Sequence, residues 1–320
     1  MDIADELQEV AGRRMLLPVR TATHSLAWAT EHKAQVRAIL RERGALLIRG
    51  LRFHGTRQFG LFLEEIFERP LAEYIYRSTP RTRLGSNVYT ATEYHPSETI
   101  VQHNESSYAN EWPMLIGFFC MIPPAPGNGG ATPLADSREV LSRLPPQIVE
   151  KFEARKLLYV RNYGCVDLPW NEVFQTEDRQ QVEAFCAKNR ISCEWTANNG
   201  LRTRQITPAT EIHPITGERV WFNQAHLFHI SSLADEVARE MLSVYRMEDL
   251  PRNVYFGDGT SIDVDDLNRI RAAYDEVKFH FDWQKDDIAL LDNMLYTHGR
   301  QPYSGARKIL VGMAHPHSRT

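Results

Sequence analysis

The sequence predicts a mainly β fold with helical insertions, of the kind that suits a double-stranded β-helix with a jelly-roll or cupin-like core. Two observations carry this prediction. Many short extended runs alternate with a few helical stretches along the 320 residues. Three extended runs then close the chain, at 278–283, 288–293 and 307–314. Periodicity alone leaves another α+β fold open, because short apolar runs look alike in both.

Local signals justify the elements of the first half in order. Apolar positions at Val36, Ile39 and Leu40 followed by Gly44 predict a helix over 25–43 with a glycine C-cap. Residues 45–51 then predict a strand. Ser137 is a candidate N-cap of a helix that stops near Pro145-Pro146, and a second helix is expected from there toward Arg155.

The second half follows the same logic. Asn198-Asn199-Gly200 is typical of a hairpin turn, and Thr216-Gly217 separates two extended runs. Strands are expected at 157–163 and 219–223, and helices at 177–189, 232–245 and 263–277.

The chain is expected to form a single domain over residues 1–320. No linker, repeat or low-complexity tract divides it, and the Pro-rich stretch 122–130 is short enough to be a stiff loop. Residues 137–277 are expected to contribute lid and rim insertions to the core.

Composition indicates a cytoplasmic enzyme. Charged residues make up 24% and the net charge is −4, which excludes the electrostatic pattern of a nucleic-acid-binding protein. No run of 18 apolar residues suggests a membrane span, and the acidic N-terminus is unlike a secretory signal. The four cysteines form no Cys-x-x-Cys pair and are expected to be reduced thiols: Cys120, Cys165, Cys186 and Cys193.

Four residues form a set typical of a mononuclear non-haem iron(II) oxygenase: His103, Glu105, His298 and Arg307. Two histidines and one carboxylate hold one face of an iron ion and leave the opposite face open. An arginine nearby can bind a dicarboxylate through two parallel hydrogen bonds. Because residues i and i+2 of a strand share a face, we expect His103 and Glu105 to lie on one strand. His298 follows the apolar run 288–291, which predicts another.

The spacing alone does not single out this site. With 12 histidines and 41 acidic residues in 320 positions, chance gives about one or two His-x-Asp/Glu triplets. The chain has two, His103-Asn104-Glu105 and His280-Phe281-Asp282. The alternative for the first triplet is an ordinary surface loop in which the two side chains hydrogen-bond locally.

Four ordered segments resemble those of a known family: GALLIRGL at 44–51, HNESSY at 103–108, GGATPLADSR at 129–138, and DDIALLDN at 286–293 followed by HGR at 298–300. On these segments the chain resembles the TauD/TfdA-like superfamily of iron(II)/2-oxoglutarate-dependent dioxygenases. It looks nearest to the branch of syringomycin-type amino-acid hydroxylases of natural-product pathways. The resemblance implies the double-stranded β-helix, Fe(II) as the metal, and 2-oxoglutarate and O2 as co-substrates.

The resemblance also implies roles for individual residues. His103, Glu105 and His298 match the metal ligands, whereas the second triplet falls where the family has none. Thr132 and Arg307 match the contacts to 2-oxoglutarate. Arg307 lies nine residues after His298, a shorter interval than in many relatives, and Lys308 is also basic. Only one of two successive strand residues faces the co-substrate, and we favour Arg307 because its planar fork suits a carboxylate.

Three further residues are candidates for contact with the substrate: Tyr108, Asn223 and Gln224. The two amides can hydrogen-bond a carboxylate or an amine. The alternative is that both amides satisfy backbone groups and that Tyr108 is a wall of the cavity.

The implied function is hydroxylation of an unactivated C–H bond of an amino acid, either free or tethered to a peptidyl carrier protein. Glu105 disfavours halogenation, since related halogenases have a small residue in its place. Within the superfamily, the alternatives are a catabolic dioxygenase of a sulfonate or aryloxy acid, and a desaturase or cyclase. From other classes, the alternatives are a non-oxidative metal cupin hydrolase or isomerase, and a non-catalytic jelly-roll binding module.

Overall fold

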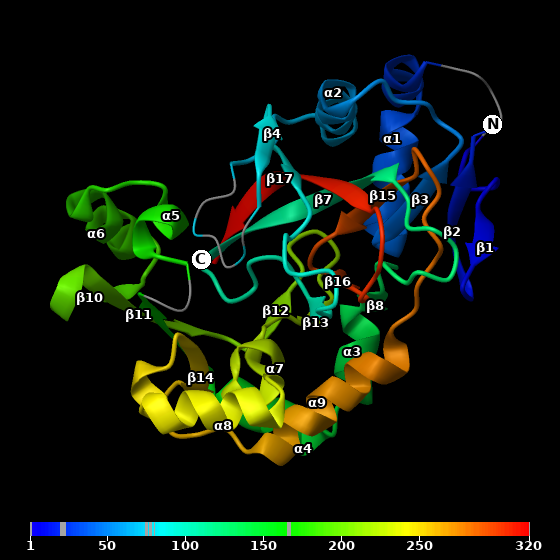
Figure 1. The fold of residues 1–320 in the computed structure, drawn as a ribbon. Coiled ribbons are helices and arrows are strands. Elements are labelled where there is room, and N and C mark those ends of the chain that lie inside the picture. Colours follow the sequence, from blue (N-terminus) through cyan, green and yellow to red (C-terminus); the bar gives the residue numbers. More distant parts are fainter. Residues whose placement is uncertain are drawn as a thin grey trace.

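The computed structural model of the chain describes residues 2–19, 24–73, 76, 79, 81–164 and 168–319. Its main sheet has eight strands in the order β1-β2-β3-β15-β7-β17-β5-β4 (Figure 1). They are β1 (Gln8–Val10), β2 (Arg13–Pro18), β3 (Ala45–Arg49), β4 (Arg83–Gly85), β5 (Val88–Thr90), β7 (Glu111–Ile122), β15 (Ile288–Asp292) and β17 (Lys308–Ser318). The β2–β3 pair is parallel and the other neighbours are antiparallel.

A second, three-stranded sheet has the order β6-β16-β8. It consists of β6 (Ile100–His103), β8 (Leu134–Asp136) and β16 (Tyr296–Arg300). The central strand β16 therefore pairs with two segments that lie far before it in the sequence. This sheet carries both histidines of the predicted metal site.

Alternation along β3 shows why the main sheet has two covered faces. Leu46 and Ile48 belong to the core cluster that includes Trp28 and Phe62 of the N-terminal helices. Ala45 and Leu47 belong to another cluster, on the opposite face. A strand buried on both faces has a continuous apolar sequence, as β3 has.

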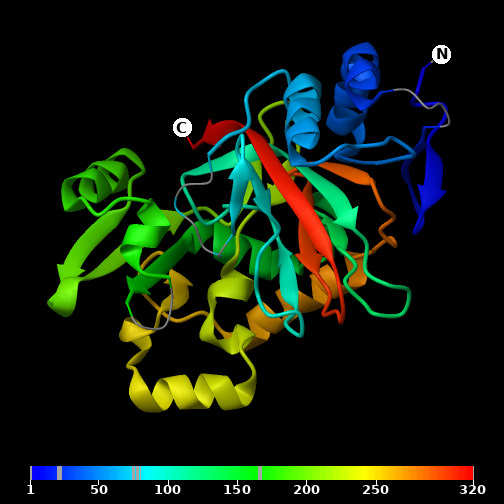
Figure 2. The same ribbon diagram turned by 45° about the horizontal axis from the view of Figure 1, so that its top comes forward.

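Helices α1 (Ser25–Arg43) and α2 (Thr56–Phe67) cover the first of these faces (Figures 1 and 2). The helix predicted over 25–43 is confirmed, and Gly44 ends it with a left-handed φ of 78°. A Cβ added at Gly44 would lie 2.9 Å from Leu295 Cβ, so this glycine also allows the close approach of the segment between β15 and β16.

Residues 137–277 build a further layer, most of which lies below the main sheet in Figure 1, on the side away from α1 and α2. Its four-stranded sheet has the order β10-β11-β9-β14, and its two-stranded sheet pairs β12 with β13. The strands are β9 (Leu157–Tyr163), β10 (Ser192–Thr196), β11 (Gly200–Thr207), β12 (Thr210–Ile212), β13 (Arg219–Trp221) and β14 (Arg252–Phe256). The lid and rim role of this region stays a prediction.

The helices of this layer include the five predicted ones, whose ends lie within three residues of the prediction, and two short ones at 170–174 and 225–228 that the sequence did not predict. They are α3 (Ser137–Arg143), α4 (Pro146–Arg155), α5 (Trp170–Phe174), α6 (Arg179–Lys188), α7 (Ala225–Phe228), α8 (Asp235–Val244) and α9 (Val264–Val277), with short 3-10 turns η1 (Ala197–Asn199), η2 (Ile230–Ser232) and η3 (Met247–Asp249).

Two predictions of local structure outside the candidate site are wrong. The N-cap of α3 is Asp136 rather than Ser137, because the Asp136 carboxylate accepts a hydrogen bond from the Arg138 backbone N–H. Residues 278–283 form no strand, and Phe279 makes only an isolated bridge to Leu134. No helix in the described part of the chain is long and apolar enough to cross a membrane. Cys120, Cys186 and Cys193 are free thiols, and Cys165 lies outside the described residues.

Candidate active site

Two neighbouring strands bring the two histidines together. β6 and β16 pair antiparallel, and His298 lies directly opposite His103 in their register. Side chains at opposite positions of an antiparallel pair point to the same face. The two imidazole centroids are accordingly 4.5 Å apart. His298 thus lies within a strand, whereas the sequence predicted it just after one.

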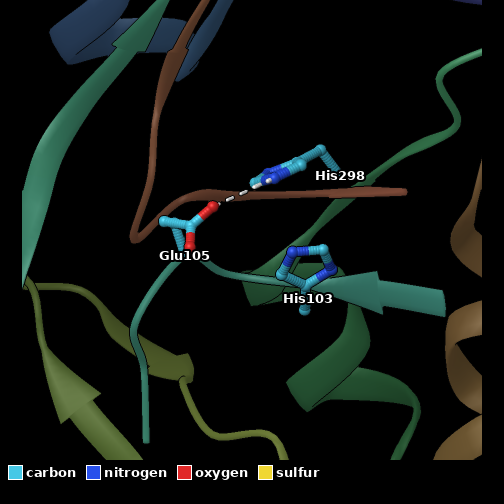
Figure 3. A group of neighbouring side chains, drawn as sticks. All are labelled: His103, Glu105 and His298. Atoms are coloured by element: carbon cyan, nitrogen blue, oxygen red, sulfur yellow. Dashed lines mark ion pairs between the residues drawn. The ribbon is translucent and has the colours of Figure 1, made fainter. Parts of the chain in front are cut away.

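Glu105 follows β6 instead of continuing it. The strand ends at His103, and Glu105 begins a turn in which Ser106 has a φ of 57°. The expectation that His103 and Glu105 share a strand is therefore wrong. The turn still brings the carboxylate to the histidines, because one ligand atom from each of the three residues lies within 4.8 Å of the others (Figure 3).

The side chain of Asn293 holds this turn in place. Its Oδ1 accepts a hydrogen bond from the Glu105 backbone N–H at 2.7 Å, and its Nδ2 donates to the Glu105 carbonyl at 2.9 Å. Asn104 completes the link by donating from Nδ2 to the Asn293 carbonyl at 2.6 Å. The peptide that carries the candidate carboxylate ligand is thus fixed to the end of β15.

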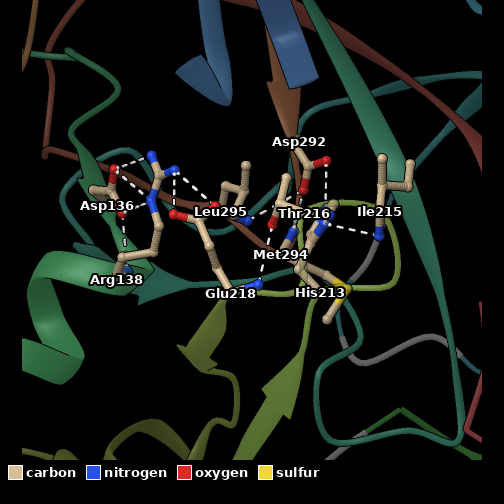
Figure 4. A network of polar contacts seen from close by, with 9 residues as sticks. All are labelled: Asp136, Arg138, His213, Ile215, Thr216, Glu218, Asp292, Met294 and Leu295. Carbon is tan, nitrogen blue, oxygen red and sulfur yellow. Dashed lines mark hydrogen bonds and ion pairs between the residues drawn. The ribbon is translucent and has the colours of Figure 1, made fainter. Parts of the chain in front are cut away.

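The neighbouring Asp292 is itself anchored by the layer of residues 137–277 (Figure 4). Nδ1 of His213 accepts hydrogen bonds from the backbone N–H groups of Ile215 and Thr216, so its Nε2 carries the proton and donates to Asp292 Oδ2 at 3.0 Å. Asp292 Oδ1 accepts from the backbone N–H of Met294 at 2.9 Å. The β12–β13 loop therefore supports the turn that places Asn293.

Both histidines are kept neutral, as metal ligands must be. Burial lowers the pKa of His103 and lowers that of His298 well below its usual range. Nδ1 of His103 donates to the Val101 carbonyl at 2.8 Å, which leaves the Nε2 lone pair free for a metal. Nδ1 of His298 is buried without a hydrogen-bond partner among the described residues. Two neutral imidazoles beside one carboxylate fit a divalent metal ion.

Arg81 also reaches this cluster. Its Nη2 lies 2.5 Å from Glu105 Oε2, and both side chains are 3% exposed. The His298 Nε2 atom is 3.8 Å from the same carboxylate oxygen. The candidate carboxylate ligand therefore already has a cationic neighbour within the protein.

A cavity beside the cluster contains the candidate co-substrate residues. It is lined by Arg81, Ala91, Thr92, Ile100, His103, Phe118, Thr132, His298, Gly299, Arg300, Arg307 and Ile309. Arg307 donates from Nη2 to Thr132 Oγ1 at 3.2 Å and from Nε to the Gly130 carbonyl at 2.7 Å. Trp283 Nε1 donates to the same Thr132 oxygen at 2.9 Å. Burial lowers the pKa of Arg307 to about 10, so the guanidinium is still charged at neutral pH.

The choice between the two basic residues at 307 and 308 agrees with the geometry. Arg307 lines the cavity, whereas Lys308 is absent from its described lining. A charged guanidinium and a hydroxyl, next to the candidate metal ligands, fit a dicarboxylate such as 2-oxoglutarate.

The three candidate substrate residues are committed to other contacts. Asn223 donates from Nδ2 to the Ala209 carbonyl at 2.7 Å and accepts from the Ala225 backbone N–H at 3.0 Å. Gln224 donates to the Asn104 carbonyl at 2.8 Å. Tyr108 is 1% exposed, and its hydroxyl donates to the Tyr76 carbonyl at 3.0 Å. These contacts favour structural roles, and a direct contact of any of the three with substrate stays a prediction.

Three residues that shape the site were not predicted from the sequence: Arg81, Trp283 and Asn293. Asn293 lies inside the segment that carried the resemblance, so its position was a usable signal. Arg81 precedes His103 by 22 positions and matches no motif. Trp283 is adjacent to the rival triplet, and only the fold reveals its bond to Thr132.

Comparison with known proteins identifies the family. The model of the taurine catabolism dioxygenase TauD, TfdA family matches residues 17–314. The chain belongs to the TauD/TfdA family. It is therefore a dioxygenase of the iron(II)/2-oxoglutarate-dependent type that its sequence predicted.

Two relatives of known sequence cover most of the chain. The dapdiamide synthesis protein DdaC of Enterobacter agglomerans is 39% identical over 279 residues, which span 87% of this chain and 84% of that protein. A clavaminate synthase-like protein of Arabidopsis thaliana is 28% identical, over 86% of this chain and 83% of that protein.

Solved structures share the fold at low identity. PvcB of Pseudomonas aeruginosa superposes with a TM-score of 0.54 at 15% identity, covering 93% of this chain and 84% of that one. An asparagine oxygenase gives a TM-score of 0.54 at 13% identity, over 90% and 79%. The predicted mainly β fold with a double-stranded β-helix core is thereby confirmed.

Proposed function

We propose that this TauD/TfdA-family dioxygenase hydroxylates an unactivated C–H bond of a small polar amino acid, free or tethered to a carrier protein, in a natural-product pathway. The observation that carries the proposal is the buried cluster of His103, Glu105 and His298, whose ligand atoms lie within 4.8 Å of one another. A complete facial triad supports oxygenation over halogenation, because Glu105 occupies the position that a halide needs.

In this proposal His103, Glu105 and His298 hold the iron, and Thr132 and Arg307 bind the distal carboxylate of 2-oxoglutarate. The iron and the co-substrate, when bound, supply the oxidising power for C–H hydroxylation. The protein residues bind and orient the iron and the co-substrate, and they exclude water from the site. Arg307 offers a preorganised fork, since Gly130 and Thr132 already hold its guanidinium.

Exclusion of water follows from the burial of the site. His103, Glu105 and His298 are 8%, 3% and 5% exposed. The Phe118 ring lies 5.0 Å from the His298 ring and covers one side of it. A dry site strengthens the charge interactions that orient a dicarboxylate and limits side reactions with solvent.

The substrate class rests on a relative rather than on geometry. DdaC, which is 39% identical, is named for dapdiamide synthesis, and a role in a biosynthetic pathway is consistent with the resemblance to syringomycin-type hydroxylases. A carrier-tethered substrate requires an open mouth for its arm, whereas a free amino acid requires a closed pocket with groups for both its amine and its carboxylate.

Parallel reactions test the proposal. The protein is supplied with Fe(II), 2-oxoglutarate and O2 and either free amino acids or the same amino acids loaded on a carrier protein. We expect mass spectrometry to show a gain of one oxygen in one set and none with the His298→Ala variant. Turnover of a sulfonate or aryloxy acid, without any oxidised amino acid, would contradict the proposed substrate and place the chain in a catabolic role.

A further inference from the structure

The ion pair between Arg81 and Glu105 has a second feature besides its burial. The Glu105 oxygen that Arg81 contacts, Oε2, is also the oxygen that faces the Nε2 atom of His298. Because Oε2 lies 3.8 Å from His298 Nε2, a metal ion held by both residues would bind this same oxygen. The guanidinium and such a metal ion would therefore compete for one atom.

The surroundings make this contact strong. At 3% exposure neither partner is well screened by water, and hydrogen bonds between two charged groups are stronger than those between neutral ones. A buried carboxylate is stable only when it is paired or hydrogen-bonded, and Arg81 supplies such a partner. Arg81 thus orients Glu105, and any second cation must compete with it.

The other arginines of the cavity do not share this position. Arg300 donates to the backbone carbonyls of Tyr94 and His95 at 3.0 and 2.7 Å. Arg307 donates to Gly130 and Thr132. Neither of these two has a hydrogen bond or ion pair to Glu105 among the described contacts, so the competition is specific to Arg81.

We propose that Arg81 is a positioning residue that competes with the metal ion for Glu105 Oε2 and thereby sets the metal affinity of the site. The inference rests on the proposed metal ligands. Metal binding then exchanges one cation for another at Glu105. A carboxylate oriented in advance by Arg81 would thus bind the metal more weakly, and the displaced guanidinium would remain in the cavity that Arg81 lines together with Thr132 and Arg307.

Titration of the full-length protein with Mn(II), followed by isothermal calorimetry and by the EPR signal of free Mn(II), tests this competition without turnover. Arg81→Gln is expected to bind Mn(II) about tenfold more tightly than the wild type, a change of about 1.4 kcal/mol. Arg81→Lys keeps the charge and should tighten binding less. A purely structural role of Arg81 would instead weaken binding in both variants.

Two matched controls separate direct competition from the general loss of a positive charge. Arg83→Gln removes a charge two positions away, from a side chain that is 50% exposed and pairs with Glu73. Arg307→Gln removes a buried charge from the same cavity. We expect both controls to bind Mn(II) as the wild type does. A thermal unfolding scan of each variant checks the fold, and Arg81→Lys serves if Arg81→Gln does not fold.

The outcomes are distinct. Tighter binding in Arg81→Gln, with unchanged binding in the controls Arg83→Gln and Arg307→Gln, supports the inference. Equal or weaker binding in a folded Arg81→Gln, or equal tightening in Arg307→Gln, overturns it while leaving the metal ligands intact. If the wild type binds no Mn(II), or His298→Ala binds it equally well, the proposed ligand set fails and the inference fails with it.

Discussion

The two His-x-acid triplets of the chain have the same spacing and opposite surroundings. In His103-Asn104-Glu105 all three side chains are buried, at 8%, 0% and 3% exposure. In His280-Phe281-Asp282 only Phe281 is buried, and the histidine and the aspartate face solvent. Spacing alone therefore does not distinguish the candidate metal site from the other triplet.

The difference lies in what each triplet is paired with. The first begins at the last residue of a strand, where the partner strand places His298 opposite His103, and Asn293 binds both the N–H and the carbonyl of Glu105. In the second triplet burial alternates from residue to residue: Phe281 packs in the core, and the residues on either side of it are exposed. The first triplet is the candidate site because a distant segment supplies a third candidate ligand and another fixes the Glu105 turn.

The largest expected difference between the triplets is in turnover. Replacing His103, Glu105 or His298 by Ala should lower oxygenation at least about 100-fold, the upper end of what loss of a residue supporting a metal ligand costs. His280→Ala should leave turnover unchanged, because its side chain is exposed. Co-substrate-dependent release of succinate measures both. Equal losses in His280→Ala and His298→Ala would remove the distinction.

Next in size is the effect on the co-substrate. Arg307→Ala should raise the KM for 2-oxoglutarate sharply, since losing one partner of a desolvated charge pair costs roughly 2–5 kcal/mol. Lys308→Ala should change it little, because Lys308 does not line the described cavity. Initial rates at varied 2-oxoglutarate give both values, and a reversal of the two effects would show that the chosen register is off by one residue.

A smaller effect, on metal affinity, is expected at Asn293, whose side chain supports the first triplet. Asn293→Ala removes both hydrogen bonds to the Glu105 peptide and should weaken Mn(II) binding about 10- to 100-fold. Asn223→Ala removes a comparable buried amide that bonds to Ala209 and Ala225. We expect it to lower the unfolding temperature without weakening Mn(II) binding. Similar metal affinities in the two variants would refute the positioning role of Asn293.

The smallest effect concerns pH. His226 donates to the Gln102 carbonyl beside the first triplet, and burial lowers its pKa from 6.5 to about 3. Between these values the unfolded chain binds a proton that the folded chain does not, so the free energy of unfolding falls as the pH drops below 6.5. His226→Gln should flatten this fall by up to about 1.4 kcal/mol per pH unit. Urea unfolding at pH 5 and 7 measures the slope, and the exposed His280→Gln is the control.

Local sequence signals were sufficient to predict the bounds of some helices and strands. The helix over 25–43 and the strand over 157–163 have the predicted bounds, because a glycine cap and a short apolar run fix them. The N-cap of α3 was displaced by one residue, since Asp136 and Ser137 are both good caps and only the fold selects between them.

For the site, the sequence predicted which residues act as candidate ligands but not the contacts that position them. The three candidate ligands lie together as expected, but Glu105 does so from a turn that depends on Asn293, which is 188 positions away. Arg81 contacts Glu105 although the two residues are 24 positions apart, and no sequence motif marks Arg81. Contacts of this kind are set by tertiary packing, which no local pattern encodes.

The central claim is that the first triplet and His298, not the second triplet, hold the metal that binds 2-oxoglutarate. Anaerobic addition of Fe(II) and 2-oxoglutarate should produce the visible absorption band of the iron–2-oxoglutarate complex with the wild type and with His280→Ala. The band should be absent with His298→Ala. A band of full intensity in His298→Ala, or its loss in a folded His280→Ala, would contradict the claim.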